Sequence, residues 1–138
     1  MAPHARPPAQ GLLALDALEL RDKIAGGAIR ATDLARACLD QVRAVYGTVR
    51  AWAWLDESHV MAEAERLDNW QQEGRALGPL HGLPVGVKDI IDTADMPTEM
   101  GSPIYAGWRP KADAPVVMAL RRAGATPIGK TATCVVRP

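Results

Sequence analysis

The stretch from residue 78 to 89, which reads GPLHGLPVGVKD, limits the fold of this chain more than any other feature. Two prolines and three glycines interrupt it, so its first half is predicted to be a shaped loop with little helical freedom. Val85 and Val87 then alternate with Gly86 and Lys88, which predicts a short strand that ends at the lysine. The glycine at position 86 leaves room for a neighbour to approach the backbone closely.

Lys88 stands at the end of this apolar strand. An ammonium group in a buried strand needs a partner, or it must lose its proton. Spacing alone favours the more common situation, a lysine at a strand end whose side chain reaches water. A neutral lysine that acts as a base is the alternative, and the strand pattern leaves both open.

The stretch resembles the lysine segment of the amidase signature family, which typically reads G-x-P-x-x-V-K-D. Four further blocks follow in that family's order: Met100-Gly101-Ser102, Asp113-Ala114, Arg122-Ala123-Gly124-Ala125 and Ile128-Gly129-Lys130-Thr131. The resemblance extends over roughly residues 16–133. It implies that Lys88 is the catalytic lysine of an enzyme that hydrolyses amide C–N bonds in small molecules without a cofactor.

The family resemblance also implies a mechanism. A serine attacks the amide carbonyl, and a second serine in a cis peptide linkage passes its proton to the lysine. That lysine must be neutral to accept the proton, and burial is what lowers a lysine pKa. The apolar side chains within residues 85–91 are therefore expected to give Lys88 a dry setting, while Asp89 points to the opposite face of the strand.

Neither catalytic serine implied by the resemblance is expected within these 138 residues. The family's Gly-Ser-Ser-Gly-Gly-type segment lies farther downstream, and the chain has only Ser58, expected to cap a helix, and Ser102, expected in a loop. After Thr131 the family usually continues to Glu-Phe-Ala, whereas this chain reads ATCVVRP. The difference fits a truncated or frame-shifted product, or one part of a split enzyme whose complementing chain supplies the serines.

A second hypothesis is a non-catalytic remnant or interaction module with an exposed sheet edge. A neighbouring reading frame with a Gly-Ser-Ser-Gly-Gly segment would favour the enzyme, and its absence would favour the module. The resemblance covers both free-standing amidases and the amidase subunit of tRNA-dependent amidotransferases, and the loop from Pro97 to Pro110 is more similar to the former. In either case the chain alone is expected to be weakly stable and to self-associate.

The composition and the remaining polar residues argue against nucleic-acid, membrane and metal binding. Sixteen basic and 16 acidic residues give no charged patch for nucleic acid or a membrane surface. Cys38 and Cys134 make no disulfide framework, which indicates a reducing, cytoplasmic setting. The acidic residues around positions 89–99 form no recognisable metal set. His81 could serve as a base, but a histidine in such a turn is more often structural. Trp52 and Trp54 are expected to share one face of a strand and to cover a packed helix rather than to stack on a nucleotide base.

The periodicity of apolar residues predicts helices near 14–25, 32–45, 58–73 and 113–123, and strands near 49–55, 84–88 and 126–129. Thr32 and Asp113 are expected to cap helices, and Gly47 to end one. The order indicates an α/β fold, and the resemblance makes it a partial mixed sheet with flanking helices, the N-terminal part of the amidase signature fold. Residues 1–11 are expected to be a disordered lead-in, and residues 12–138 an incomplete amidase signature domain.

Overall fold

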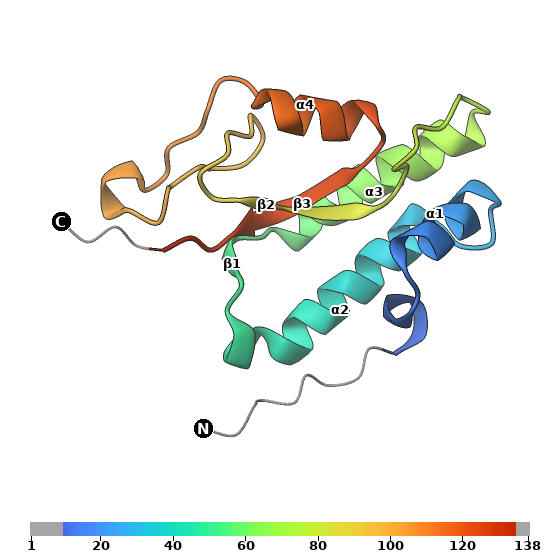
Figure 1. Ribbon diagram of the computed structural model, residues 1–138, viewed down its shortest axis with the longest axis horizontal. Coiled ribbons are helices and arrows are strands. Elements are labelled where there is room, and N and C mark those ends of the chain that lie inside the picture. Colours follow the sequence, from blue (N-terminus) through green and yellow to red (C-terminus); the bar gives the residue numbers. More distant parts are fainter. Residues whose placement is uncertain (1–9, 135–138) are drawn as a thin grey trace.

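The computed structural model describes residues 10–134, and its α/β class confirms the predicted one (Figure 1). The elements in chain order are η1 (Gly11–Ala14), α1 (Ala17–Ala25), α2 (Ala31–Val49), β1 (Trp52–Trp54), α3 (Glu57–Gln72), β2 (Pro84–Lys88), η2 (Pro103–Tyr105), α4 (Pro115–Arg122) and β3 (Thr126–Thr131). Each predicted helix and strand has a counterpart here. Residues 1–9 of the expected lead-in lie outside the described residues, whereas Gly11 already begins η1.

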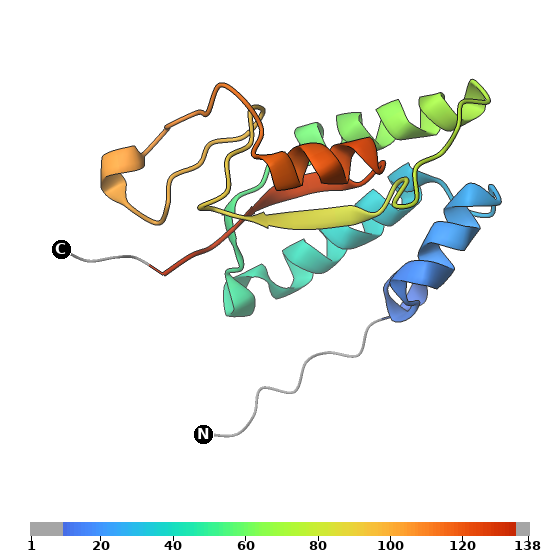
Figure 2. The same cartoon turned by 45° about the horizontal axis from the view of Figure 1, so that its top comes forward.

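The sheet is mixed, with the strand order β1-β3-β2. β3 pairs antiparallel with β1 and parallel with β2, and α4 makes the crossover that parallel strands require. Helices α2 and α4 lie on opposite sides of the strands in both views (Figures 1 and 2). Because β2 and β3 are parallel, their carboxyl ends share one edge of the sheet. The segment that carries η2 extends from this edge, away from the helices (Figure 2).

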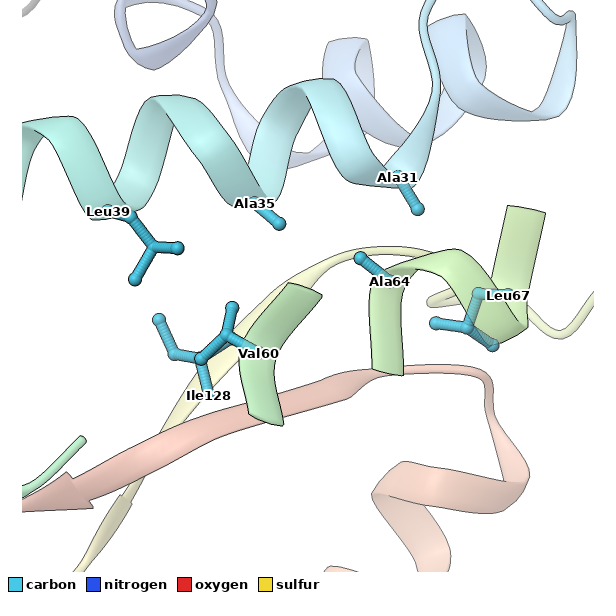
Figure 3. Close-up of a cluster of buried hydrophobic side chains, with 7 residues drawn as sticks. All are labelled: Ala31, Ala35, Leu39, Val60, Ala64, Leu67 and Ile128. Carbon is cyan, nitrogen blue, oxygen red and sulfur yellow. The ribbon is translucent and has the colours of Figure 1, made fainter. Parts of the chain in front are cut away.

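The core joins the two longest helices to the sheet. Its fully buried members come from α2, α3 and β3: Ala31, Ala35, Leu39, Val60, Ala64, Leu67 and Ile128 (Figure 3). Alanines on both facing helices let the two backbones approach closely. A second buried cluster, of Leu20, Ile24 and Leu34, attaches α1. The half-buried Cys38 packs against it, and burial raises the pKa of its thiol, which agrees with a small core residue.

The start of α2 differs from the prediction, because Thr32 lies within the first turn and Arg30 is the N-cap residue. The backbone N–H groups at the start of this turn donate hydrogen bonds to a side chain of α3. The buried carboxylate of Asp68 accepts hydrogen bonds from Ala31 N (2.7 Å), Thr32 N (3.2 Å) and Thr32 Oγ1 (2.7 Å). The cap therefore comes from a neighbouring helix, which a local sequence rule cannot detect.

The end of α2 was also predicted too early. Gly47 lies inside the helix, which continues to Val49 and ends where Arg50 adopts a left-handed conformation with φ of 46°. The last turn of α2 thus takes up the beginning of the strand predicted over 49–55, and β1 is shortened to three residues. A glycine in an exposed helical turn costs stability without breaking the helix.

Two other predicted caps are wrong, at the starts of α3 and α4. Asp56, not Ser58, caps α3 by accepting a hydrogen bond from His59 N at 3.1 Å. Asp113 does not cap α4, because its carboxylate accepts a hydrogen bond from Arg121 Nε at 2.9 Å. The cap of α3 is a local bond that Asp56 makes in place of Ser58, whereas the carboxylate of Asp113 is engaged by partners outside the first turn of α4, Ala94 N and Arg121.

Candidate functional site

The glycine-rich loop before β2 is fixed to the turn that follows α4. Leu80 N donates to Ala123 O at 2.8 Å, and Gly82 N donates to Gly124 O at 2.9 Å. A Cβ atom at Gly78 would lie 2.2 Å from Ala123 O, a distance that no side chain tolerates. The loop is therefore shaped as predicted, and its first glycine is required by backbone contact with the end of α4.

The glycine inside β2 makes room for close neighbours, as predicted. A Cβ atom at Gly86 would lie 2.9 Å from Thr131 Cγ2 and 3.3 Å from Trp52 Cη2, and one at Gly129 would lie 2.9 Å from Trp52 Cε3. The indole of Trp52 thus lies across the neighbouring strands, where two glycines make room for it. The close neighbours of Gly86 are side chains, whereas a Cβ atom at Gly129 would also lie 2.7 Å from the backbone oxygen of Trp54. Trp52 packs against the core cluster of α2, α3 and β3.

Lys88, the predicted catalytic residue, ends β2 and is exposed, whereas Val87 and Asp89 on either side of it are buried. Asp89 therefore faces away from the lysine side chain, as expected. The expected dry setting is not provided by the described residues, since Ile90 is itself 52% exposed. The physical reason is that β2 is an edge strand of the described sheet, so its lysine reaches water.

A second lysine at the same end of the sheet has the buried setting that was expected for Lys88. The side chain of Lys130 is 0% exposed. Its Nζ donates to Thr98 Oγ1 (2.6 Å), Pro97 O (3.0 Å) and Thr93 Oγ1 (3.4 Å). The strand register pairs Lys130 with Val87, one position before Lys88.

The surroundings of Lys130 act on its charge in opposite directions. Burial lowers the pKa of Lys130, and the nearby carboxylates of Asp89, Asp92 and Asp95 act to raise it. The nearest carboxylate oxygen, Asp89 Oδ1, lies 3.8 Å from Nζ. The sequence marked Lys130 only as part of a matched block. Its burial depends on the pairing of β2 with β3 and on hydroxyl partners more than thirty residues away, so no local signal could have found it.

The other two candidate site residues, His81 and Ser102, make hydrogen bonds that support the fold. His81 is buried, its Nε2 lies 3.1 Å from Leu67 O, and burial lowers its pKa, so the ring is neutral and supports the end of α3. Ser102 Oγ accepts a hydrogen bond from Ile104 N at the start of η2. Within residues 10–134, no three His, Cys, Asp or Glu side chains gather in a group that could hold a metal ion. In the same residues, no helix has the length and apolar character needed to cross a bilayer.

The sequence profile of the Amidase family matches residues 33–136 of this chain. A glutamyl-tRNA(Gln) amidotransferase subunit from Chloroflexus aurantiacus is 43% identical over 107 residues, which is 78% of this chain and 22% of that protein. The protein of the same name from Salinispora arenicola is 41% identical over 120 residues, 87% of this chain and 24% of that protein. The chain thus spans about a quarter of the length of these curated relatives.

Solved structures agree with the family match. The X-ray structure of native peptide amidase from Stenotrophomonas maltophilia has a TM-score of 0.77 and 38% identity, covering 84% of this chain and 24% of that one. A fatty acid amide hydrolase structure has a TM-score of 0.80 and 25% identity, covering 87% of this chain and 21% of that one. The resemblance stated from the lysine stretch and the blocks after it is confirmed: this chain belongs to the amidase signature family.

Proposed function

We propose that this chain supplies the lysine-bearing part of an amidase, with Lys88 as the base of a serine–cis-serine–lysine mechanism and a small-molecule amide as substrate. The serines come from a Gly-Ser-Ser-Gly-Gly segment outside these residues. One observation carries the proposal: Lys88 is exposed at the carboxyl end of a strand that is parallel to its neighbour. Ligands of open α/β sheets bind at the carboxyl ends of their strands.

The backbone around Lys88 supports a fixed position for the base. Lys88 pairs with Thr131 of β3, its carbonyl oxygen accepts a hydrogen bond from Ile91 N at 2.9 Å, and Asp89 N donates to Thr131 O at 3.0 Å. A base must stand within hydrogen-bond reach of the proton that it takes, so an anchored strand end suits that role.

The exposure of Lys88 requires a further step before it can act as a base. A lysine must be neutral to accept a proton, and burial in apolar surroundings is what favours the neutral form. A segment that carries the serines would cover this face, and the outer edge of β2, which has no strand partner among residues 10–134, is open to added strands. The same edge is the basis for the expected self-association when the covering segment is absent.

The assay is ammonia release from simple aryl and aliphatic primary amides. The chain alone should give no turnover above background, and addition of a separate chain with the serine-rich segment should restore turnover. In the restored enzyme, Lys88→Ala should lower kcat by about 10⁴-fold or more, because the members of such a constellation act as a unit. Lys88→Arg should fare no better, since a guanidinium does not give up its proton.

The matched control is Lys111→Ala, which removes an exposed lysine and should leave the restored activity unchanged. Turnover by the isolated chain that survives Lys88→Ala would refute the role of Lys88. Failure of every serine-bearing chain to restore activity would favour the interaction module instead.

A reducing, cytoplasmic setting is part of the proposal, because both cysteines are free thiols in the described structure.

A further inference from the structure

Lys130 is a buried cation to which the proposed mechanism gives no task. Its ammonium is fully enclosed, and a buried charge is costly unless it is paired and hydrogen-bonded. Each of its three protons has an acceptor, two threonine hydroxyls and one backbone carbonyl, all in the segment from Thr93 to Thr98. The enclosed group cannot reach a substrate, so its contribution must pass through the residues that it holds.

The hydroxyls of Thr93 and Thr98 connect the ammonium of Lys130 to the backbone of this segment. Thr93 Oγ1 donates to Met96 O at 3.2 Å, and Thr98 Oγ1 donates to Ile91 O at 3.4 Å. Each hydroxyl therefore accepts from Lys130 and donates to a carbonyl within the same segment. One ammonium thus closes residues 91–98 into a compact turn at the carboxyl ends of β2 and β3.

Asp89 connects this turn to the strand. Its Oδ1 lies 3.8 Å from Lys130 Nζ and accepts a hydrogen bond from Glu99 N at 3.1 Å. Its carbonyl oxygen accepts from Met100 N at 2.9 Å, and its own N–H donates to Thr131 O at 3.0 Å. Asp89 is 2% exposed and is the residue directly after Lys88. Any movement of Asp89 would therefore move the strand end that carries the proposed base.

We propose that Lys130 is a positioning residue for Lys88: it fastens Asp89 and the 93–98 turn to the end of the parallel strand pair, and so sets the direction in which Lys88 leaves β2. The inference rests on the proposed role of Lys88 for its functional meaning. Its structural part, the link from Lys130 through Asp89 to Lys88, can be tested without any catalytic activity.

The variant that isolates this link is Thr98→Val, which removes the shortest of the three acceptors while keeping the side-chain shape. Thr98→Ser keeps the hydroxyl and is the conservative rescue, and Lys130→Met removes the cation itself. Lys111→Met is the matched control, because Lys111 is exposed. The chain has only four lysines, so isotope labelling of lysine gives few side-chain NMR signals, with Lys88 among them.

Two measurements on the full 138-residue chain decide the matter. In Thr98→Val, amide hydrogen exchange at Glu99 and Met100, whose N–H groups bond to Asp89, should accelerate about tenfold or more, since hydrogen bonds to charged groups are the stronger ones. The side-chain signal of Lys88 should shift, while the signal of Lys23 on α1 stays. If Lys130→Met folds, it should likewise accelerate this exchange and shift the Lys88 signal. Thr98→Ser should give the wild-type exchange rates and the wild-type Lys88 signal.

The inference is overturned if Thr98→Val lowers the melting temperature but leaves the Lys88 signal and the exchange at Glu99 and Met100 as in the wild type, or if Thr98→Ser fails to restore them. In the complemented enzyme, Thr98→Val should lower kcat with little change in KM. Activity that persists in Lys88→Ala would refute the proposed function instead, and the exchange and NMR results would still decide whether Lys130 positions the strand end.

Discussion

The capping of α2 by a residue of another helix gives a sharp stability prediction. The carboxylate of Asp68 on α3 accepts three hydrogen bonds from the first turn of α2, two from backbone N–H groups and one from the hydroxyl of Thr32. Ala31 and Thr32, which carry these donors, are buried, with 1% and 5% exposure. Asp68→Ala would leave the donors without their acceptor in a place that water does not easily reach.

The cost follows from the donors. An unsatisfied buried donor costs about 1–3 kcal/mol, and loss of a helix cap costs about 0.5–2 kcal/mol. Two backbone donors are affected, while the hydroxyl of Thr32 can turn toward another acceptor, so we expect Asp68→Ala to lower the free energy of unfolding by about 3 kcal/mol. A domain has about 5–15 kcal/mol in total, so the loss is a large fraction of it. Thr32→Val removes one bond and should cost about 1 kcal/mol.

Urea unfolding followed by circular dichroism measures these differences. Glu65→Ala is the matched control, because Glu65 is an exposed acid on the same helix, and it should leave the midpoint nearly unchanged. The double variant Asp68→Ala/Thr32→Val should lower the free energy of unfolding little more than Asp68→Ala alone. In Asp68→Ala the hydroxyl of Thr32 has already lost its carboxylate acceptor. Equal midpoints for Asp68→Ala and Glu65→Ala, or full additivity in the double variant, would refute the cap.

Two further predictions concern the loop before β2, and a third concerns α2. Burial lowers the pKa of His81 in the folded chain, so the stability that the neutral ring contributes is present above about pH 6.5 and is lost as the pH falls through the lowered value. His81→Gln should flatten the decline in urea midpoint between pH 7 and 5, and an unchanged slope would contradict the buried neutral ring. Gly78→Ala should destabilise the fold by about 2 kcal/mol or more, because its Cβ would strike a backbone oxygen at 2.2 Å. Gly47→Ala, in an exposed turn of α2 with nothing within 4 Å, should instead raise stability by about 0.5–1 kcal/mol, and melting curves showing the same sign for both would contradict the contact.

Element positions were predictable where the signal is local. Apolar periodicity located α3 and β2 to within one residue, because one face of each packs against the core or a neighbouring strand. The ends of α2 were not predictable in the same way. Its start depends on Asp68, which is more than thirty residues away, and its end depends on Arg50 in a left-handed conformation that is uncommon outside glycine.

The strand position of the proposed base was predictable from the sequence, but its environment was not. Strand alternation predicted that Lys88 ends β2 and that Asp89 faces away from it, and the structure has both. Whether a strand-end lysine is dry depends on what lies over it, and the described residues leave Lys88 and the neighbouring Ile90 exposed. The buried lysine is Lys130, and its partners Thr93 and Thr98 belong to a segment whose sequence has no period to reveal how it folds back.

The contrast between Lys130 and Lys88 explains how the carboxyl ends of β2 and β3 can hold a buried charge and also present a base to solvent. Lys130 and Lys88 occupy successive register positions on paired strands, yet one is enclosed by acceptors and the other is open to water. The enclosed cation is held in place by three acceptors and a carboxylate, so it can stabilise the turn without taking part in proton transfer. Within residues 10–134 the ammonium of Lys88 makes no hydrogen bond, so a covering segment can displace its water without breaking any bond that the described fold depends on.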